Sequence, residues 1–149
     1  MNYTCPLCSI DASNHSLTKL KEINNTIYYY SCPSQAKLYF DYQGITNHYH
    51  GELSLIPENK KWIWICDSKD FGFNHFIQIK VAIELAKLIS SKFSTNLLQI
   101  IIINPTIYIS SSYNIIKPFL SEKVNEIILF NYESKTIDDI FLGLENNGF

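Results

Sequence analysis

Three short apolar runs dominate the hydrophobic pattern of the chain. They cover residues 62–67 (WIWICD), 97–104 (LLQIIIIN) and 124–130 (VNEIILF), and longer segments of helical character separate them. Short and nearly unbroken apolar runs are typical of strands that crossover helices bury on both faces of a sheet. Parallel strands need such crossovers, which are almost always right-handed. The pattern therefore predicts an α/β unit of three parallel strands and two helices.

The first intervening segment predicts a deeply packed core helix. Asn74 is a suitable N-cap residue, and the polar residues Lys80, Glu84 and Lys87 recur at helical spacing. The remaining positions form an apolar surface wider than one sheet contact requires, which favours burial on several sides.

The second intervening segment predicts a weaker helix. Asn104 and Pro105 suit the N-cap and the first helical position. The serines at 110–112 lower its intrinsic helix propensity, and Pro118 should kink or restart it after Lys117. If any element moves, we expect it to be this helix.

The segment before the first apolar run has the composition of strands. Residues 26–32, 36–42 and 51–56 are rich in Tyr, Ile and Leu, and turn residues separate them. We predict that they form an N-terminal antiparallel meander that continues into the parallel βαβαβ core. The predicted fold class is thus α/β with a mixed sheet. We expect one domain over residues 1–149, with a cysteine-bearing segment at 1–35 and the α/β core at 36–149.

Charge and hydropathy exclude several classes of protein. A formal net charge of −2 over 149 residues argues against nucleic-acid binding. The longest apolar run is far too short for a transmembrane segment. The first residues, MNYTCPLCSI, have neither a basic nor an apolar signal region, so we predict a cytoplasmic protein with reduced thiols.

Cysteine spacing indicates a candidate structural zinc site. Cys5 and Cys8 form a C-x-x-C turn of the kind that zinc knuckles use, and Cys32 begins a second, incomplete one. We expect His15 to be the fourth ligand, although His48 or His50 could replace it. The alternative is a cluster of reduced thiols without metal. His48 and His50 alternate along a predicted strand, and exposed positions on an edge strand explain that spacing better than metal binding.

We expect a protein without enzymatic activity. The chain contains no G-x-S-x-G, P-loop, G-x-G-x-x-G or H-E-x-x-H motif. Asp67 ends a core strand, where an α/β enzyme would place a catalytic carboxylate, and it could form a paired site with Asp70, but two acids in one turn are commonly just solvated.

Three motifs resemble the CRAL-TRIO family of lipid-binding domains. They are WIWICD with the following FGFNHF, the strand LLQIIIIN, and NPTIYISSSYNIIKPFLSEKVNEIILF. The resemblance covers roughly residues 62–144 and departs from the family at Asp70 and Pro105. It implies a minimal, truncated member in which a cysteine-bearing extension replaces the helical N-terminal module. It also implies that Asp67 is a structural residue that caps the following turn.

The same resemblance implies a lipid or another hydrophobic ligand and a gate helix matching residues 107–120. The side chains implied at the ligand pocket are those of the apolar stripe of that helix: Ile109, Tyr113, Ile116, Phe119 and Leu120. STAS domains have a related, smaller architecture. The alternative function is therefore a STAS-like interaction module with a filled core, which binds a partner protein or forms a homo-oligomer through an exposed apolar patch.

Overall fold

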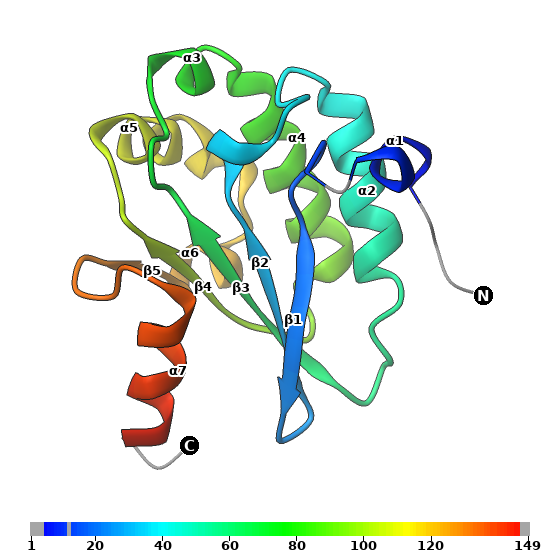
Figure 1. Ribbon diagram of the computed structural model, residues 1–149, viewed down its shortest axis with the longest axis vertical. Helices are drawn as coiled ribbons and strands as arrows, with labels where there is room; N and C mark the ends of the chain where they lie inside the picture. Colours follow the sequence, from blue (N-terminus) through cyan, green and yellow to red (C-terminus); the bar gives the residue numbers. More distant parts are fainter. Residues whose placement is uncertain (1–4, 12, 147–149) are drawn as a thin grey trace.

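A five-stranded mixed sheet organises the computed structural model, which describes residues 5–11 and 13–146. Its strands lie side by side in chain order (Figure 1): β1 (Thr18–Ile23), β2 (Thr26–Ser31), β3 (Lys61–Asp67), β4 (Leu97–Ile103) and β5 (Ile128–Asn131). β1 and β2 are antiparallel, whereas β2 to β5 are parallel. The predicted α/β class with a mixed sheet and a parallel core is confirmed.

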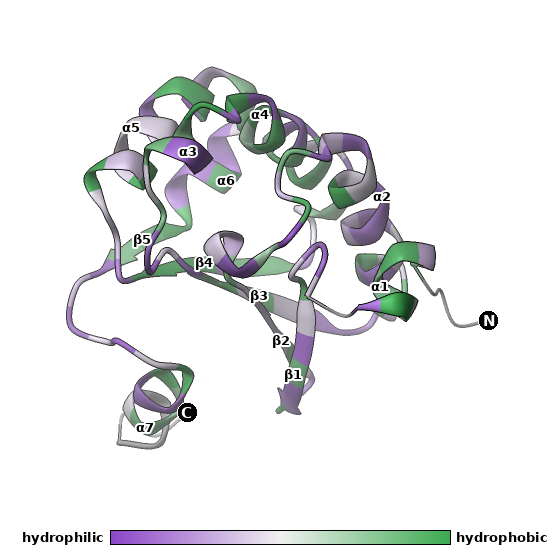
Figure 2. Ribbon diagram, turned by 45° about the horizontal axis from the view of Figure 1, so that its top comes forward, coloured by the Kyte–Doolittle hydropathy of each residue, from purple (hydrophilic) through white to green (hydrophobic). Residues whose placement is uncertain are grey.

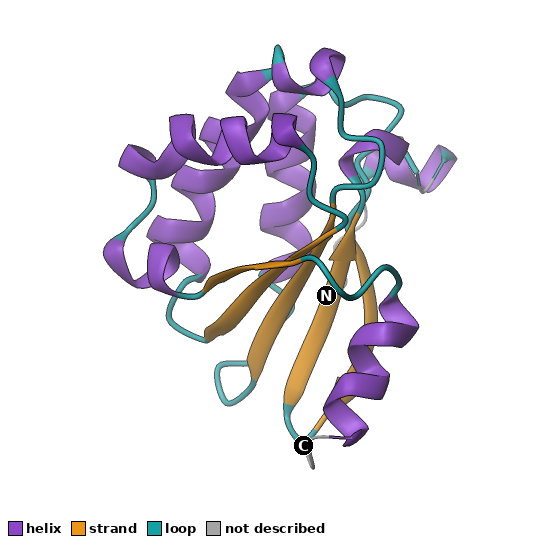
Figure 3. Cartoon of the chain, turned by 90° about the vertical axis from the view of Figure 1, so that its left-hand side faces the viewer, coloured by secondary structure: helices purple, strands orange, loops and turns teal. Residues whose placement is uncertain are grey.

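The helices are distributed unequally between the two faces of the sheet. They are α1 (Pro6–Ile10), α2 (Tyr42–Leu53), α3 (Phe73–Phe76), α4 (Ile79–Leu88), α5 (Ile107–Ile116), α6 (Glu122–Glu126) and α7 (Ile137–Asn146). Figures 2 and 3 show α2, α4 and α5 over one face and α7 alone on the other. Each crossover adds the next strand in the same direction, so crossovers of one hand place their helices on one face. The expectation that crossover helices bury both faces is therefore wrong, because α7 covers the second face.

The sheet is apolar on both faces, and alternate residues of each strand belong to different cores. On β3, Trp62 and Cys66 point toward the crossover helices, whereas Ile63 and Ile65 point toward α7. This division explains the nearly unbroken apolar runs in the sequence, since most residues of β3 and β4 are buried on one face of the sheet or the other.

The predicted meander is wrong beyond β2. Residues 37–40 form turns, and the segment 51–56 that reads as a third strand contains the last residues of α2 and the turn after them. Asp41 is the N-cap of this helix, because its Oδ1 accepts a hydrogen bond from the backbone N–H of Gly44 at 3.1 Å. The buried positions Ile45, Tyr49 and Leu53 recur at helical spacing. Tertiary burial of this face outweighs the strand preference of its aromatic and β-branched residues.

The antiparallel partner of β2 precedes it in the chain. β1 consists of TKLKEI, whose polar residues do not read as a strand. A two-residue turn joins the strands, and both of its residues have positive φ: 52° at Asn24 and 63° at Asn25. A type I′ hairpin turn requires this geometry, and Asn tolerates it.

The crossover helices begin at other residues than predicted, and the first of them is divided into several pieces. The first crossover divides into α3, α4 and a π-helical turn at Ile89–Phe93. In the second, Thr106 caps α5 by accepting a hydrogen bond from the backbone N–H of Ile109 at 3.2 Å. Asn104 has a φ of 51° and therefore lies outside the helix. As predicted, the α-helix ends before Pro118, which lies in a 3₁₀ turn at Lys117–Phe119.

The ends of three parallel strands meet at Asp67. The buried carboxylate accepts hydrogen bonds from the hydroxyl of Tyr30 at 2.8 Å, from Asn104 Nδ2 at 3.0 Å and from the backbone N–H of Lys69 at 3.0 Å. These donors come from β2, from the turn after β3 and from the residue after β4. Burial and the adjacent carboxylate together raise the pKa of Tyr30, which remains a neutral donor. This geometry supports the capping role of Asp67.

Substitution of Asp67 should measure the strength of this strand-end contact. Asp67→Ala leaves three donors without their acceptor, so we expect the free energy of unfolding to fall by about 2–3 kcal/mol in urea denaturation. Asp138→Ala removes an exposed carboxylate on α7 and should change it by less than about 1 kcal/mol. Equal effects of the two substitutions would contradict the assigned role.

Candidate functional site

A cavity of about 110 Å³ lies between the sheet and the helices α2, α4 and α5. It lies on the face that the crossover helices cover, where Trp64 and Cys66 of β3 and Ile100 and Ile102 of β4 form its floor. Its walls include the following side chains: Ile45 and Tyr49 of α2; Leu85, Ala86 and Ile89 of the α4 segment; and Ile109, Ser112, Tyr113 and Ile116 of α5. The cavity is therefore enclosed by every crossover of the parallel sheet.

Most of the predicted pocket residues on α5 and its extension face this cavity. Ile109, Tyr113, Ile116 and Leu120 line it. Phe119 does not line it; this side chain is 39% exposed, and the ammonium of Lys87 lies 5.3 Å from its ring centroid. Whether a ligand contacts these four side chains remains a prediction, but the structure places them where a ligand in the cavity would meet them.

The lining of the cavity is almost entirely apolar. Among the described residues that line it there is no Asp, Glu, Lys or Arg. Burial raises the pKa of the Cys66 thiol to about 12 and also raises the pKa values of the Tyr39 and Tyr49 hydroxyls, so these groups stay neutral. Such a lining suits an apolar molecule and disfavours an ion, because transfer of an unpaired charge from water into it is costly.

The helix α5 forms the most loosely held wall of the cavity. Ser112 is its single fully buried residue, and Ile107 is 75% exposed. Two side-chain hydrogen bonds fix it at separate points: Thr106 Oγ1 donates to the carbonyl of Phe71 at 2.7 Å, and the hydroxyl of Tyr113 donates to Asn125 Oδ1 at 3.2 Å. The helix α4 has two fully buried residues, Val81 and Ala86, so outward movement of α5 should cost less free energy than outward movement of α4.

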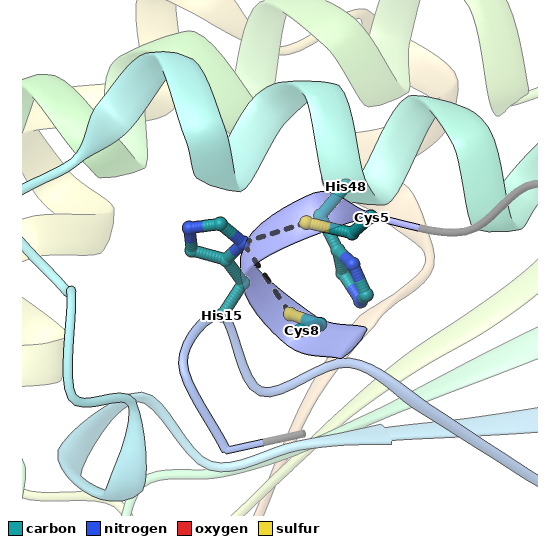
Figure 4. A group of neighbouring side chains, drawn as sticks. All are labelled: Cys5, Cys8, His15 and His48. Carbon is teal, nitrogen blue, oxygen red and sulfur yellow. Dashed lines mark hydrogen bonds between the residues drawn. The ribbon is translucent and has the colours of Figure 1, made fainter. Parts of the chain in front are cut away.

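Two cysteines and two histidines gather at one end of the cavity. One ligand atom from each of Cys5, Cys8, His15 and His48 lies within 4.8 Å of the other three. The sulfur atoms point toward the ring of His15 (Figure 4), whose Nδ1 lies 3.4 Å from Cys5 Sγ and 3.5 Å from Cys8 Sγ. These four side chains, the Cys/His cluster, could hold a metal ion.

Local structure explains how these residues meet. Pro6 at the first position of α1 starts a single helical turn, which places Cys5 and Cys8 on the same side. His15 lies in the loop before β1, and His48 projects from the middle of α2. The cluster thus joins α1 and the loop that follows it to α2, which lies farther along the chain.

Each histidine is oriented by a hydrogen bond at its second ring nitrogen. His15 Nε2 lies 3.3 Å from Asp41 Oδ2, and His48 Nε2 lies 3.2 Å from the carbonyl oxygen of Leu17. Metal-binding histidines commonly donate their other N–H to such acceptors, which fixes the tautomer and the ring orientation. This arrangement leaves Nδ1 of both rings available to a metal. His48 Nδ1 is buried and has no hydrogen-bond partner among the described residues.

The donor set and the two sulfur–nitrogen distances at His15 fit tetrahedral zinc. Zinc–sulfur bonds of about 2.3 Å and zinc–nitrogen bonds of about 2.0–2.1 Å at tetrahedral angles separate S and N by about 3.6 Å. The two Sγ–Nδ1 distances of 3.4 and 3.5 Å agree with this separation. Without a metal, burial raises the pKa of the Cys8 thiol to about 11 and lowers that of His48. Zinc would bind the thiolate form and displace its proton.

The cluster contains three of the four predicted ligands. Cys32 lies outside it, at the end of β2, with its Sγ 3.4 Å from Ser34 Oγ. His48 takes the fourth place, and the expectation that it occupies an exposed edge strand is wrong, because it is buried on a helix. His50 lies on the exposed side of the same helix. Asp41 is the signal in the sequence that could have revealed α2, because aspartate is a favoured N-cap residue. In a helix that starts there, His48 and His50 lie on different sides, as the structure shows.

The helix α1 has no hydrophobic anchor. None of its five residues is buried, and Leu7 and Ile10 are 39% and 84% exposed. Cys5, just before the helix, is buried and belongs to the Cys/His cluster. A short helix without packed side chains is unstable alone in water, so the contacts of the cluster must contribute to holding α1 in place.

The cavity and the cluster meet at His15. Its ring lines the cavity and also belongs to the cluster. On α2, His48 lies between Ile45 and Tyr49 at helical spacing, and both of these neighbours line the cavity. One face of one helix therefore supplies a metal-binding side chain and part of the cavity wall.

The family model of the CRAL/TRIO domain matches residues 5–142 of the chain, and this range includes both the cavity and the cluster. A comparison with curated protein sequences gives no match. Across the part of the chain that the structure describes, every helix is too short or too polar to cross a membrane.

Gly44 permits the close approach of α2 to Asp41 and His15. A Cβ atom at this position would lie 2.0 Å from Asp41 Oδ2 and 2.8 Å from His15 Nε2. Alanine normally stabilises a helix by about 1 kcal/mol relative to glycine, but here we expect Gly44→Ala to lower the melting temperature. Gly143→Ala on α7 is the control, because its Cβ would meet no atom within 4 Å. A rise in melting temperature for both variants would show that Gly44 is not required.

Proposed function

Since the chain belongs to the CRAL/TRIO domain family, we propose that it binds a lipid or another apolar small molecule in the cavity beneath α5. The family assignment agrees with the resemblance found in the sequence, and members of this family bind lipophilic ligands. The observation that carries the proposal for this chain is the almost entirely apolar cavity between the sheet and α5. The proposed role is binding rather than catalysis, because the carboxylate of Asp67 is engaged in structural hydrogen bonds.

The volume of the cavity requires α5 to move when a ligand of lipid size binds. Binding pockets for small molecules usually measure about 300–1,000 Å³, and a dry cavity of about 150 Å³ is enough for benzene. The observed 110 Å³ therefore accommodates only part of a lipid. The exposed surface of α5, its serine run and the 3₁₀ turn that follows it support this helix as the gate.

The alternative function is a STAS-like interaction module that binds a partner protein or a second copy of the chain. A cavity that never opens would support this alternative, because the molecule would then act through its surface. The exposed side chains of Phe73, Ile77 and Ile107 would be candidates for that surface. A direct measurement of ligand binding separates the two functions.

We propose in addition that Cys5, Cys8, His15 and His48 bind one structural zinc ion. The observation that carries this proposal is the buried Nδ1 of His48, which lacks a partner among the described residues while Nε2 of the same ring is already hydrogen-bonded. Four protein ligands complete a tetrahedral shell and leave no position open for a substrate, as in structural zinc sites. The ion would fasten α1 and the loop at His15 to α2, and its binding energy would contribute to folding.

Filling the cavity should abolish ligand binding without unfolding the protein. We expect one molecule of the uncharged fluorescent probe N-phenyl-1-naphthylamine to bind per chain. Ala86→Leu projects a larger side chain into the cavity and should weaken binding at least about tenfold, with the melting temperature unchanged or raised. Lys87→Leu adds the same side chain at the next, exposed position and should leave the affinity unchanged. Failure of the wild-type chain to bind the probe would favour the interaction module.

Substitution of Cys8, inside the cluster, and of Cys32, outside it, distinguishes a zinc site from unrelated thiols. Elemental analysis of the wild-type protein should find one zinc per chain, and cobalt(II) in its place should give the absorption of a tetrahedral thiolate complex. Cys8→Ser should lose the metal and lower the melting temperature, whereas Cys32→Ser should retain the metal. A metal-free protein whose melting ignores a chelator, or equal metal loss in both variants, would overturn the assignment.

A further inference from the structure

Ser112 places an unpaired hydroxyl in the wall of the cavity. The residue is 2% exposed, and its Oγ has no hydrogen-bond partner among the described residues. It lies in the middle of α5 and lines the cavity together with apolar side chains. Of the other two buried polar side-chain atoms without a partner in the described chain, His48 Nδ1 belongs to a residue of the Cys/His cluster, and Ser68 does not line the cavity.

A purely structural role does not account for this serine. A buried hydroxyl without a partner costs about 1–3 kcal/mol, and serine is a poorer helix former than alanine. Alanine would therefore serve better at this position if the cavity wall only had to pack. The neighbouring Ser111 is exposed, where a hydroxyl can bond to water at no such cost.

The rest of the lining restricts what the hydroxyl could bind. The described lining residues include no Lys or Arg that could neutralise an anion and no Asp or Glu that could neutralise a cation; the one histidine, His15, is engaged by Asp41 and by the thiols of the Cys/His cluster. A carboxylate or phosphate in this position would lose its hydration and gain no opposite charge, which is strongly unfavourable. A neutral oxygen needs only one hydrogen bond to offset its desolvation, and Ser112 Oγ can donate or accept that bond.

On the premise of the proposed binding function, we propose that Ser112 is the polar anchor of the ligand site and that the ligand is an uncharged lipophile carrying one hydrogen-bonding oxygen. A hydroxyl or a carbonyl group meets this description. The apolar part of the ligand fills the space among Ile109, Tyr113 and Ile116, and the oxygen lies against Ser112. Ser112 thereby determines specificity, and α5 contributes both the gate and the recognition group.

Three probes that share one benzene ring test whether the site selects an uncharged ligand with an oxygen: toluene, benzyl alcohol and benzoate. Each is titrated at pH 7, and binding is followed by protein NMR. Ser112→Ala should weaken the binding of benzyl alcohol about fivefold and leave the affinity for toluene unchanged. It should also leave the melting temperature unchanged or raised, which excludes loss of the fold as the cause. Ser111→Ala is the matched control and should alter neither affinity.

Ser112→Thr keeps the hydroxyl and should preserve the binding of benzyl alcohol. Benzoate should bind at least about a hundredfold more weakly than benzyl alcohol to the wild-type protein.

Each outcome separates this inference from the binding function on which it rests. Equal affinity of wild type and Ser112→Ala for benzyl alcohol, with toluene still bound, would overturn the anchor but leave the cavity as a ligand site. Benzoate bound as tightly as benzyl alcohol would overturn the uncharged class of ligand. If neither toluene nor benzyl alcohol bound to the wild-type protein, both the anchor and the proposed function would be wrong.

Discussion

The parallel hydrogen bonding of β2, β3, β4 and β5 is the constraint on which the rest of the structure depends. Each parallel pair needs a crossover of the same hand, and the strands are added in one direction only. The crossover helices must therefore share one face of the sheet. Their side chains meet over the middle strands without filling the space completely, and the cavity is what remains. The second face has no crossover, so α7 has to cover it.

The amino-terminal part of the molecule is held by polar rather than apolar contacts. α1 buries none of its residues, yet the Cys/His cluster joins it to α2 and to the loop before β1. Asp41 connects this cluster to the secondary structure, since one carboxylate oxygen caps α2 and the other meets His15. Because His15 also lines the cavity, the position of α1 and the shape of the cavity depend on the same side chain.

The candidate site was predictable from the sequence where its signal is local. The spacing of Cys5 and Cys8 places two thiols on one turn, and the stripe containing Ile109, Tyr113 and Ile116 places three side chains on one face of α5. The role of His48 was not predictable in this way, because the residues around it have strand propensity although they form the helix α2. Packing of this helix on the sheet, rather than local propensity, determines its conformation. Ser112 likewise stands in a run of three serines, and burial alone distinguishes it from its neighbours.

The sequence by itself determined the parallel core, because strands buried on both faces must be apolar at every position and therefore leave a continuous pattern. It also determined the family and the break before Pro118, which follows from the missing backbone N–H of proline. Only the tertiary structure decided that α2 is a helix, that His48 rather than Cys32 completes the cluster, and that all crossover helices cover one face. These features depend on contacts between segments that lie far apart in the chain, and no local pattern of residues records such contacts.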